Sequence, residues 1–423
     1  MDLSRSNSYQ SVRKRKILFL AWGWSIHAQR RIQIFVDDPL FDVTVVSTYN
    51  YQFSGATTIP LSQAKNIQKI ETCHGLGRGY FSRHLSKIKN FYPISLIYKF
   101  IQELVNLGRD YSILKKTLDQ KQPDIIFLQT LLYPSYLILL IRKSVPVIIT
   151  FWNGDVTWWA KWTGVERLLK KQIVIHGVKR ATSITVNSRE AYNACINYGK
   201  SAKYIHLIRY PGVDISRFHP IDKVLAKKHI HENAQIIVFW PRGIADYLNF
   251  DTLVAASQTV LKKYNDIQFI ILFANKEVDF SIKEQLKSKG IEKNYSLINK
   301  IHFEDMPYYY SAADMMISIS SNDSLPNTML EAMACGCKVI MGDIPQIRDW
   351  VVDGQNGYLC PVKDADKLAE CIIKVIEDPQ NMNKKFIQEN LTLIKQEVES
   401  SKMSAEIKHL VRNISSKNAE TEK

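Results

Sequence analysis

The fold is decided by residues 315–336, which read MMISISSNDSLPNTMLEAMACG. The apolar run from Met315 to Ile319 predicts a buried strand, and the polar loop after it turns at Pro326. A short helix is expected next, and Gly336 can end it in a left-handed C-cap. A strand that leads through a loop into a helix is the repeating unit of a doubly wound α/β sheet.

Short runs of β-branched and aromatic residues recur along the chain, separated by longer mixed segments. Strands buried on both faces have this composition, and their alternation with helices favours a parallel sheet. The runs form two sets, at residues 17–21, 43–47, 125–128, 147–151, 184–186 and 205–208, and then at 236–240, 268–273, 315–319 and 338–341.

A polar segment near residues 212–234 separates the two sets. The sequence therefore predicts an α/β protein with two Rossmann-like domains facing across a cleft. We expect the domains at residues 1–215 and 216–395, followed by a C-terminal helix and polar tail at 396–423.

The charge of the chain points to an anionic partner. Among 423 residues, 56 Lys and Arg stand against 41 Asp and Glu, which leaves a net charge of +15. Nucleic acid, anionic lipid and phosphorylated small molecules all fit a basic protein. Because no nucleic-acid-binding motif accompanies the charge, we expect no nucleic acid partner.

The cysteines and the apolar segments indicate a cytoplasmic protein without a bound metal. The six cysteines form neither a disulfide framework nor a zinc pattern, since Cys335-x-Cys337 has the wrong spacing. The longest apolar stretch, Leu131 to Ile141, is too short to span a bilayer.

The loop and helix of the first motif contain the groups expected at a site for a phosphorylated sugar. Free backbone N–H groups around Asn327 to Leu330 suit a phosphate or diphosphate. The carboxylates of Asp323 and Glu331 suit sugar hydroxyls, which donate hydrogen bonds to them. A purely structural interpretation is also open: Thr328-x-x-Glu331 matches a capping box, and Asp323 matches an ordinary turn residue.

From Met306 to Pro361 the chain resembles the C-terminal half of the retaining, GT-B-fold glycosyltransferases of glycosyltransferase family four. Their hallmark is Glu-x7-Glu, and here Glu331 is the second acid while Asp323, one methylene shorter, stands in place of the first. The surrounding residues match as well: Tyr309 and Ser311 to Asp314 before the strand, Ala332 to Gly336 after the acid, and Asp353 to Tyr358 in the following turn.

The resemblance implies roles for these residues. Glu331 would hold the nucleotide ribose, Asn327 and Thr328 the diphosphate, and Asp323 would face the donor sugar. Arg242, after the first strand of the second domain, would bind the diphosphate, and its planar fork suits that contact. The resemblance thus gives Asp323, Glu331 and Arg242 as catalytic candidates and a donor-binding set of Gly23, Arg242, Leu325, Asn327, Thr328, Leu330 and Glu331.

The chain departs from the family pattern at two further places. The lysine usual a few residues after the arginine is absent, and Ala245 to Asn249 stands there instead. Either Tyr247 or Asn249 substitutes as a neutral donor, or catalysis is weakened. The segment Trp152 to Asp155 resembles the acceptor side of related enzymes, but Trp152 replaces the frequent histidine.

Two further segments of the N-terminal half also match the family. Trp22 to His27 resembles its first loop, in which Gly23 lets the backbone approach a ligand. Tyr210 to Asp214, followed by Phe218-x-Pro220, resembles its interdomain signature. The acceptor-side candidates are Trp152, Asp155 and His27, although capping of a helix also accounts for Asp155.

The function implied is transfer of a sugar from a nucleoside diphosphate sugar to a saccharide or lipid-linked saccharide, with retention, without a cofactor or an essential metal, in cell-surface polysaccharide or glycolipid synthesis. Because the lysine and the histidine are missing, a catalytically silent GT-B nucleotide-sugar-binding or partner subunit is the alternative.

Basic and aromatic residues interleave between Arg78 and Lys116, which is typical of a segment that rests on an anionic membrane surface. Such contact would place the protein peripherally on the inner face of the membrane. A buried apolar face with solvated lysines produces the same pattern, and both interpretations stay open.

Overall fold

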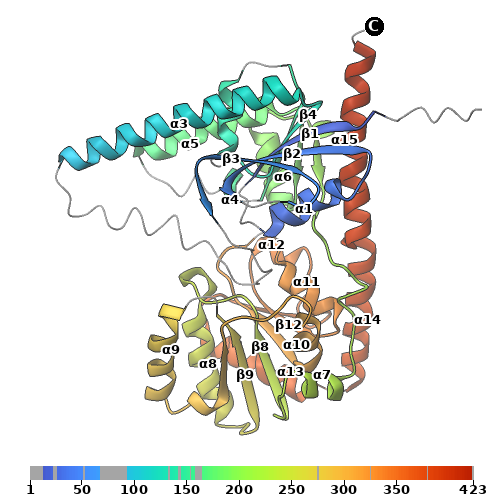
Figure 1. Ribbon diagram of the computed structural model, residues 1–423. Coiled ribbons are helices and arrows are strands. Elements are labelled where there is room, and N and C mark those ends of the chain that lie inside the picture. Colours follow the sequence, from blue (N-terminus) through green and yellow to red (C-terminus); the bar gives the residue numbers. More distant parts are fainter. Residues whose placement is uncertain are drawn as a thin grey trace, which may run out of the picture.

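The computed structural model has two lobes, each built on a parallel sheet (Figure 1). The lobes lie one above the other in this view. The segment between β7 (Ile205–Leu207) and α7 (Lys223–His229) joins them, and so do the C-terminal helices. The structure describes residues 13–21, 26–50, 53–66, 93–131, 134–141, 144–152, 154–157, 164–273, 276–323, 325–378 and 380–421.

The first sheet has seven strands in the order β3-β2-β1-β4-β5-β6-β7, all paired in parallel. Strands β1, β4, β5 and β6 are almost wholly buried, as their apolar, β-branched sequences predict. The strands are β1 (Arg15–Ala21), β2 (Phe41–Asn50), β3 (Thr57–Asn66), β4 (Ile125–Leu128), β5 (Val147–Phe151), β6 (Ser183–Val186) and β7 (Ile205–Leu207).

The second sheet has six parallel strands in the order β10-β9-β8-β11-β12-β13. The strands are β8 (Ile236–Trp240), β9 (Ile267–Leu272), β10 (Tyr295–Ile298), β11 (Met315–Ser318), β12 (Lys338–Gly342) and β13 (Tyr358–Cys360).

Helices cover both faces of each sheet, which confirms the predicted pair of Rossmann-like units. In the first lobe they are α1 (Ile26–Val36), α3 (Pro93–Lys121), η2 (Ser135–Leu140), α4 (Gly154–Thr157), α5 (Gly164–Arg180), α6 (Arg189–Asn197) and η4 (Ala202–Tyr204). In the second they are α7 (Lys223–His229), η5 (Asp246–Leu248), α8 (Phe250–Leu261), α9 (Lys276–Ser288), η6 (Glu292–Asn294), α10 (Met306–Ala312), α11 (Asn327–Ala334), α12 (Pro345–Arg348), α13 (Ala365–Glu377) and α14 (Gln380–Glu397).

The strand order reverses once in each sheet, between β1 and β4 and between β8 and β11. At such a reversal the loops that leave neighbouring strands turn to opposite faces and open a crevice at the carboxyl edge. Arg242 follows β8 and Asp323 follows β11, so the second reversal lies between the two loops that carry them.

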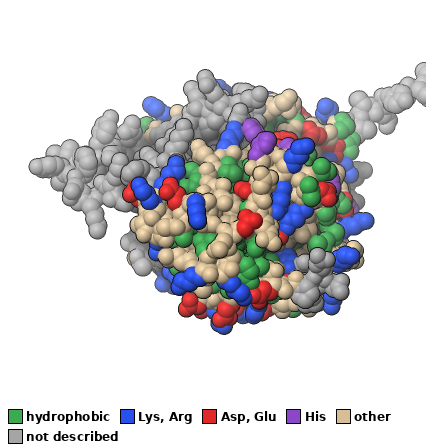
Figure 2. All heavy atoms as spheres, turned by 90° about the horizontal axis from the view of Figure 1, so that it is seen from below, with side chains coloured by type: hydrophobic (Ala, Val, Ile, Leu, Met, Phe, Trp, Pro, Cys, Tyr) green, Lys and Arg blue, Asp and Glu red, His purple; other side chains and the backbone are tan. Residues whose placement is uncertain are grey.

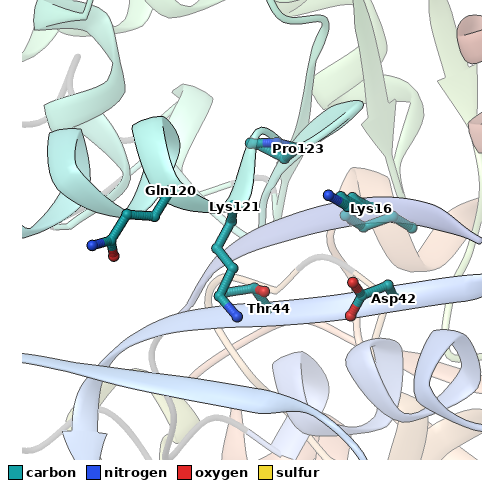
Figure 3. Close-up of a pocket in the computed structure, with 7 residues that line it drawn as sticks. Lys16, Asp42, Thr44, Gln120, Lys121 and Pro123 are labelled. Carbon is teal, nitrogen blue, oxygen red and sulfur yellow. The ribbon is translucent and has the colours of Figure 1, made fainter.

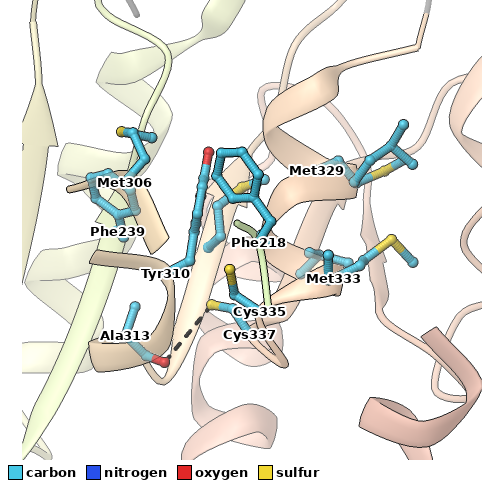
Figure 4. Close-up of a cluster of buried hydrophobic side chains, with 14 of the residues drawn as sticks. Phe218, Phe239, Met306, Tyr310, Ala313, Met329, Met333, Cys335 and Cys337 are labelled. Atoms are coloured by element: carbon cyan, nitrogen blue, oxygen red, sulfur yellow. Dashed lines mark hydrogen bonds between the residues drawn. The ribbon is translucent and has the colours of Figure 1, made fainter. Parts of the chain in front are cut away.

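The core of the second lobe on the α11 side of the sheet combines sulfur-containing and aromatic side chains (Figure 4). Met329 and Met333 of α11 pack in the same buried cluster as Phe218, and Tyr310 lies at its centre. The Cys337 thiol donates to the carbonyl oxygen of Ala313 at 3.8 Å. This packing holds α11, and with it Glu331, in a fixed position against α10.

The C-terminal segment contains a helix that packs on the first lobe. Helix α15 (Ser400–Thr421) crosses back to the first lobe, as the red helix of Figure 1 shows. Its apolar residues recur at helical spacing and therefore lie on one face of the helix. That face packs into the core against β1 and β2. The apolar residues are Met403, Ile407, Leu410, Val411 and Ile414.

The two crossings between the lobes are hydrogen-bonded to each other. Val213 donates to the carbonyl oxygen of Val398 at 2.8 Å, and Ser400 donates to the carbonyl oxygen of Val213 at 2.8 Å. Gly212, beside this pair, has a φ of +71°, and a Cβ there would lie 2.3 Å from the Val398 carbonyl oxygen. The close approach of the two crossings therefore requires glycine at position 212.

The net positive charge does not gather on the far end of the second lobe. Figure 2 shows Lys and Arg interspersed with Asp and Glu on this face, so it does not present a field of one sign. Among the helices of the described ranges, none is both long and apolar enough to cross a membrane.

We predict that Gly212→Ala destabilises the protein much more than Gly354→Ala does. Both glycines have a φ of +71°, but a Cβ at Gly354 meets no atom within 4 Å. The control therefore carries only the left-handed backbone penalty of about 1–2 kcal/mol, whereas Gly212→Ala must also push the two crossings apart. Urea unfolding at equilibrium measures the difference, and equal losses for the two variants would show that the crossings are not held together here.

Candidate functional site

An ion pair joins the two loops at the second strand reversal. The guanidinium Nη1 of Arg242 donates to the Asp323 carboxylate and, at 3.4 Å, to the Ser318 hydroxyl. The Arg242 and Asp323 side chains are only 17% and 12% exposed, respectively. Burial lowers the pKa of Arg242, but the Asp323 charge more than compensates, so that the pKa is raised and the guanidinium stays charged.

The loop that carries Arg242 is itself fixed. Gly243 donates its N–H to the carbonyl oxygen of Leu272 at 2.8 Å, and the Trp240 indole donates to the carbonyl oxygen of Gly243 at 2.7 Å. Both Arg242 contacts above use Nη1, and a guanidinium has donors on two further nitrogens. The arrangement can therefore hold Asp323 and an added anion on different edges of one planar group.

Glu331 is buried in α11 and is hydrogen-bonded to α10. Its side chain accepts a hydrogen bond from the Tyr310 hydroxyl at 3.3 Å, and only 1% of the residue is exposed. Burial, reinforced by the Glu331 charge, raises the pKa of Tyr310 well above its ordinary value, so the phenol remains a donor. Tyr310 fixes the orientation of a carboxylate that sequence reasoning had placed at the donor.

The first turn of α11 presents fewer free N–H groups than we expected. The N–H groups of Met329 and Leu330 already donate to the Pro326 carbonyl oxygen, at 3.0 and 3.4 Å. Only Asn327 and Thr328 precede these first helical bonds, so the available anion site is narrower than residues 327–330. The Leu330 side chain lies in the core, and Leu325 is also buried there.

The capping-box interpretation of Thr328 and Glu331 is wrong. Pro326 occupies the N-cap of α11, and no side chain caps the helix. The Thr328 hydroxyl instead lies inside the first turn, buried and without a hydrogen-bond partner among the described residues. Asp323 forms an ion pair with Arg242.

Asn249, one of the two neutral donors considered for the missing lysine, is already engaged. Its side-chain amide donates to the carbonyl oxygen of Ile319 at 2.7 Å and to the Ser321 hydroxyl at 2.8 Å. Its left-handed backbone, with a φ of 57°, begins α8. Asn249 thus fixes the loop after β11, and Tyr247 accepts the Ser321 N–H at its carbonyl oxygen, 2.8 Å away.

The acceptor-side candidates Trp152 and Asp155 lie together at the carboxyl ends of β4 and β5. Asp155 accepts from the Trp152 N–H at 2.8 Å and from the Thr130 hydroxyl at 2.8 Å. The Trp152 indole donates to the carbonyl oxygen of Gln129. Burial raises the pKa of Asp155 to about 6 against these hydrogen bonds, which lower it. The hydrogen bonds of Asp155 therefore connect α4 to the end of β4. Its pKa lies close enough to neutral pH for the carboxylate to accept a proton.

Two of the predicted residues cannot be placed. Gly23 lies outside the described residues, and His27 is in the first turn of α1, where its side chain is not described.

Sequence reasoning missed two arginines of α1. Arg31 is fully buried; its Nη1 donates to the Thr150 hydroxyl, and its guanidinium lies over the rings of Trp152 and Tyr210, 4.9 and 4.7 Å from their centroids. Burial lowers its pKa to about 10, which leaves it charged at neutral pH. Arg30 lies over the ring of Phe303 in the other lobe, at 4.2 Å.

The two halves of the site face each other across the interface between the lobes. Gln346 of α12 donates to Glu190 of α6, and Arg189 lies 3.9 Å from Asp349. A cavity of about 200 Å³ opens between the lobes. It is lined by Thr157 and Glu190 from the first lobe and by Ser321, Asn322, Ile344, Pro345 and Gln346 from the second.

A second hollow, of about 170 Å³, lies at the opposite edge of the first sheet (Figure 3). Lys16 and Asp42, near the amino ends of β1 and β2, line it together with Lys121. Ligands of parallel sheets bind outside the carboxyl ends of the strands, so this hollow is separate from the site. Within the described ranges, no group of three or more His, Cys, Asp or Glu side chains gathers closely enough to hold a metal ion.

Two family models match consecutive parts of the chain. Residues 93–217 match Glycosyltransferase Family 4, and residues 221–391 match Glycosyl transferases group 1. The chain is 27% identical over 220 residues to D-inositol 3-phosphate glycosyltransferase of Geodermatophilus obscurus, covering 50% of this chain and 48% of that protein. It is 22% identical over 247 residues to N-acetyl-alpha-D-glucosaminyl L-malate synthase of Bacillus anthracis, covering 57% of this chain and 61% of the relative. The chain thus spans about half the length of these curated relatives.

Solved structures share the fold over nearly the whole chain. Sucrose-phosphate synthase of Thermosynechococcus elongatus superposes with a TM-score of 0.72 at 15% identity, covering 95% of this chain and 99% of that one. The Anabaena HepE protein, solved in complex with UDP-glucose, superposes with a TM-score of 0.69 at 15% identity, covering 94% and 99%. At this level of identity the likeness establishes the GT-B fold.

The raised pKa of Asp155 predicts a pH-dependent loss of stability. A carboxyl that binds its proton more tightly in the folded state favours folding fully below its unfolded pKa, and that contribution disappears as the pH rises through about 6. Asp155→Asn removes the titration; its amide oxygen can still accept from the Trp152 N–H, while its amide nitrogen would donate to the Thr130 hydroxyl. Between pH 4 and pH 7 we expect the variant to gain about 2 kcal/mol relative to wild type, since a tenfold change in proton affinity is worth about 1.4 kcal/mol and most of the shift falls within this window.

Urea unfolding at both pH values measures this gain, and Asp266→Asn on the surface is the control. A stability difference between Asp155→Asn and wild type that stays constant with pH would contradict the raised pKa.

Proposed function

The chain belongs to the GT-B glycosyltransferases of glycosyltransferase family four, and we propose that it transfers a sugar from a nucleoside diphosphate sugar to a saccharide or lipid-linked saccharide with retention. The observation that carries this proposal is the buried Arg242–Asp323 pair beside the start of α11, at the strand reversal of the second sheet. HepE, which shares the fold, was solved with UDP-glucose and with UDP.

The donor would lie across the second lobe. Arg242 and the N–H groups of Asn327 and Thr328 would hold the diphosphate, because a helix start and a guanidinium both favour phosphate oxygens. Glu331, oriented by Tyr310, would accept the hydroxyl protons of the ribose. Asp323 would keep Arg242 in place and face the donor sugar.

The chemistry follows from these positions. As the bond between the anomeric carbon and the diphosphate oxygen breaks, its electron pair goes to the diphosphate, and the sugar develops oxocarbenium character. Arg242 and the start of α11 stabilise the growing negative charge, which is where preorganised donors accelerate a reaction. The acceptor oxygen then bonds to the anomeric carbon on the face from which the diphosphate departs, and its proton passes to the departing diphosphate oxygen. We assign no carboxylate as a covalent nucleophile, and no cofactor or metal is required by the proposal.

The acceptor would enter from the first lobe. Asp155 and Trp152 lie at the edge of that sheet, and Thr157, two residues after Asp155, lines the cavity opposite Ser321 and Asn322. Two of the matched relatives are named for acceptors that carry an acid group, inositol phosphate and malate. The excess of positive charge in this chain is compatible with an anionic acceptor of that kind.

We predict that Arg242→Ala lowers kcat by about 10²–10³, the usual effect of removing one donor from a developing anion. Arg242→Lys should keep part of the activity because it keeps the charge and loses only the planar fork. Arg348→Ala, which breaks an exposed pair with Asp343, is the control. Glu331→Gln should raise KM for the donor. Full activity in both Arg242→Ala and Glu331→Gln would overturn the assignment of the site.

The donor class and the alternative of a silent binding subunit are tested together. UDP-, GDP-, ADP- and TDP-sugars are added in turn while the melting temperature is followed, because a ligand that binds only the folded state raises it. The sugar nucleotide that stabilises the protein is then assayed for release of the nucleoside diphosphate in the presence of lipid-linked acceptors. Binding without turnover over a range of acceptors would favour the silent subunit.

A lipid-linked acceptor would require contact with a membrane. Residues 67–92, which contain much of the basic and aromatic stretch predicted to make it, lie outside the described residues. The described part adds exposed Arg109, Lys115 and Lys116 on α3. On α5, Leu168 and Leu169 are exposed by 62% and 60% among basic residues, a combination that favours an anionic lipid surface.

The double substitution of Leu168 and Leu169 by Glu should lower cosedimentation with phosphatidylglycerol vesicles by about tenfold, since it removes apolar area and adds repulsion. Val224 and Leu225 on α7, exposed by 75% and 61%, provide the matched control pair. Equal effects of the two double variants, or none, would contradict docking through α5.

A further inference from the structure

Arg30 belongs to the first lobe, but its guanidinium lies against the second lobe, which contains the proposed donor site. Its helix, α1, follows β1, yet its guanidinium lies 4.2 Å from the ring centroid of Phe303 in the second lobe. Its Nη2 is buried and has no hydrogen-bond partner among the described residues. A guanidinium nitrogen without a partner in a buried position is costly, so a ligand that offers it an acceptor would be favoured.

The surroundings of Arg30 place it along one face of α11. Burial lowers its pKa, and the Glu331 carboxylate is the strongest of the charges that raise it again. Thr328 and Glu331 are three residues apart in α11 and so share a face of the helix. The Thr328 hydroxyl is also buried without a partner. Two unused polar groups, one from each lobe, therefore lie near the same helix face.

The charge balance of the site leaves a role for this cation. Arg242 is already matched by Asp323, and Glu331 adds a further buried negative charge on α11. A nucleoside diphosphate brings two or more negative charges into this setting. Asn249 has no donor to spare for it, because its amide holds the loop after β11. Arg242 is the second-lobe cation described at the site, and a further positive charge from the first lobe would help to balance the ligand proposed above.

We propose that Arg30 binds the diphosphate of the donor across the interface, with the Thr328 hydroxyl on the opposite side, and so takes the place of a second cation in the second lobe. This inference rests on the proposed function. A phosphate oxygen can accept hydrogen bonds from both groups, and Arg30 can reach it only when the lobes are together. The first lobe thereby contributes to donor binding as well as to the acceptor side.

The test compares Arg30→Met with wild type for binding of UDP, GDP, ADP and TDP and of their nucleosides, by isothermal titration calorimetry. Methionine retains the apolar packing on Phe303 and removes the charge. We expect the nucleoside diphosphate that wild type binds best to lose about tenfold or more in affinity, and its nucleoside to lose less than about twofold, because only the diphosphate carries the charge. The affinity of Arg30→Lys for the diphosphate should fall between those of wild type and Arg30→Met.

Arg217→Met is the matched control, because Arg217 lies 4.7 Å from the centroid of the same Phe303 ring and is more exposed. If Arg30→Met unfolds, Arg30→Gln gives the same readout, since it also removes the charge. Equal losses for diphosphate and nucleoside, or no loss, would overturn the role of Arg30 while leaving the proposed function intact. A wild-type protein that binds no nucleoside diphosphate would overturn both.

Discussion

The ion pair between Arg242 and Asp323 connects the parts of this structure that matter for function. A charged guanidinium at the end of a buried strand is stable only with a partner, and the strand order of a doubly wound sheet puts the loop after β11 beside it. The Asn249 side-chain amide donates to the carbonyl oxygen of Ile319 and so fixes that loop. Helix α11 begins where the loop ends. The pair thus keeps a cation, an acid and a helix start within one rigid corner of the second lobe.

The corner in the first lobe is built differently. Arg31 is buried among aromatic rings and bonded to Thr150, and no carboxylate contributes to the charge interactions identified for it. Cation–π contacts stabilise it instead, and they hold Trp152 and Tyr210 in place around it. One lobe therefore fixes its functional edge with an ion pair and the other with aromatic rings, and the two edges meet across the cavity between the lobes.

The sequence predicts the central strands well, because buried parallel strands have a distinctive local composition. Strands β4, β5 and β8 match their runs. Strand β3 was not predicted, since its sequence is polar and contains Pro60, which only an edge strand tolerates. The Arg242–Asp323 pair spans 81 positions, and the unpaired Nη2 of Arg30 depends on the other lobe. Contacts of this kind follow from the fold and have no local signal in the sequence.

Helix α15 has a consequence for how the molecule is made. Its apolar face covers β1 and β2, so the first lobe contains both the early and the last described part of the chain. During synthesis the second lobe has all of its strands available while Ile17, Phe19 and Val45 still lack the cover that Met403 to Ile414 provides. A domain normally folds as a unit as it is made, but here the lobe translated first is the one finished last. The order of folding is therefore expected to run against the order of translation.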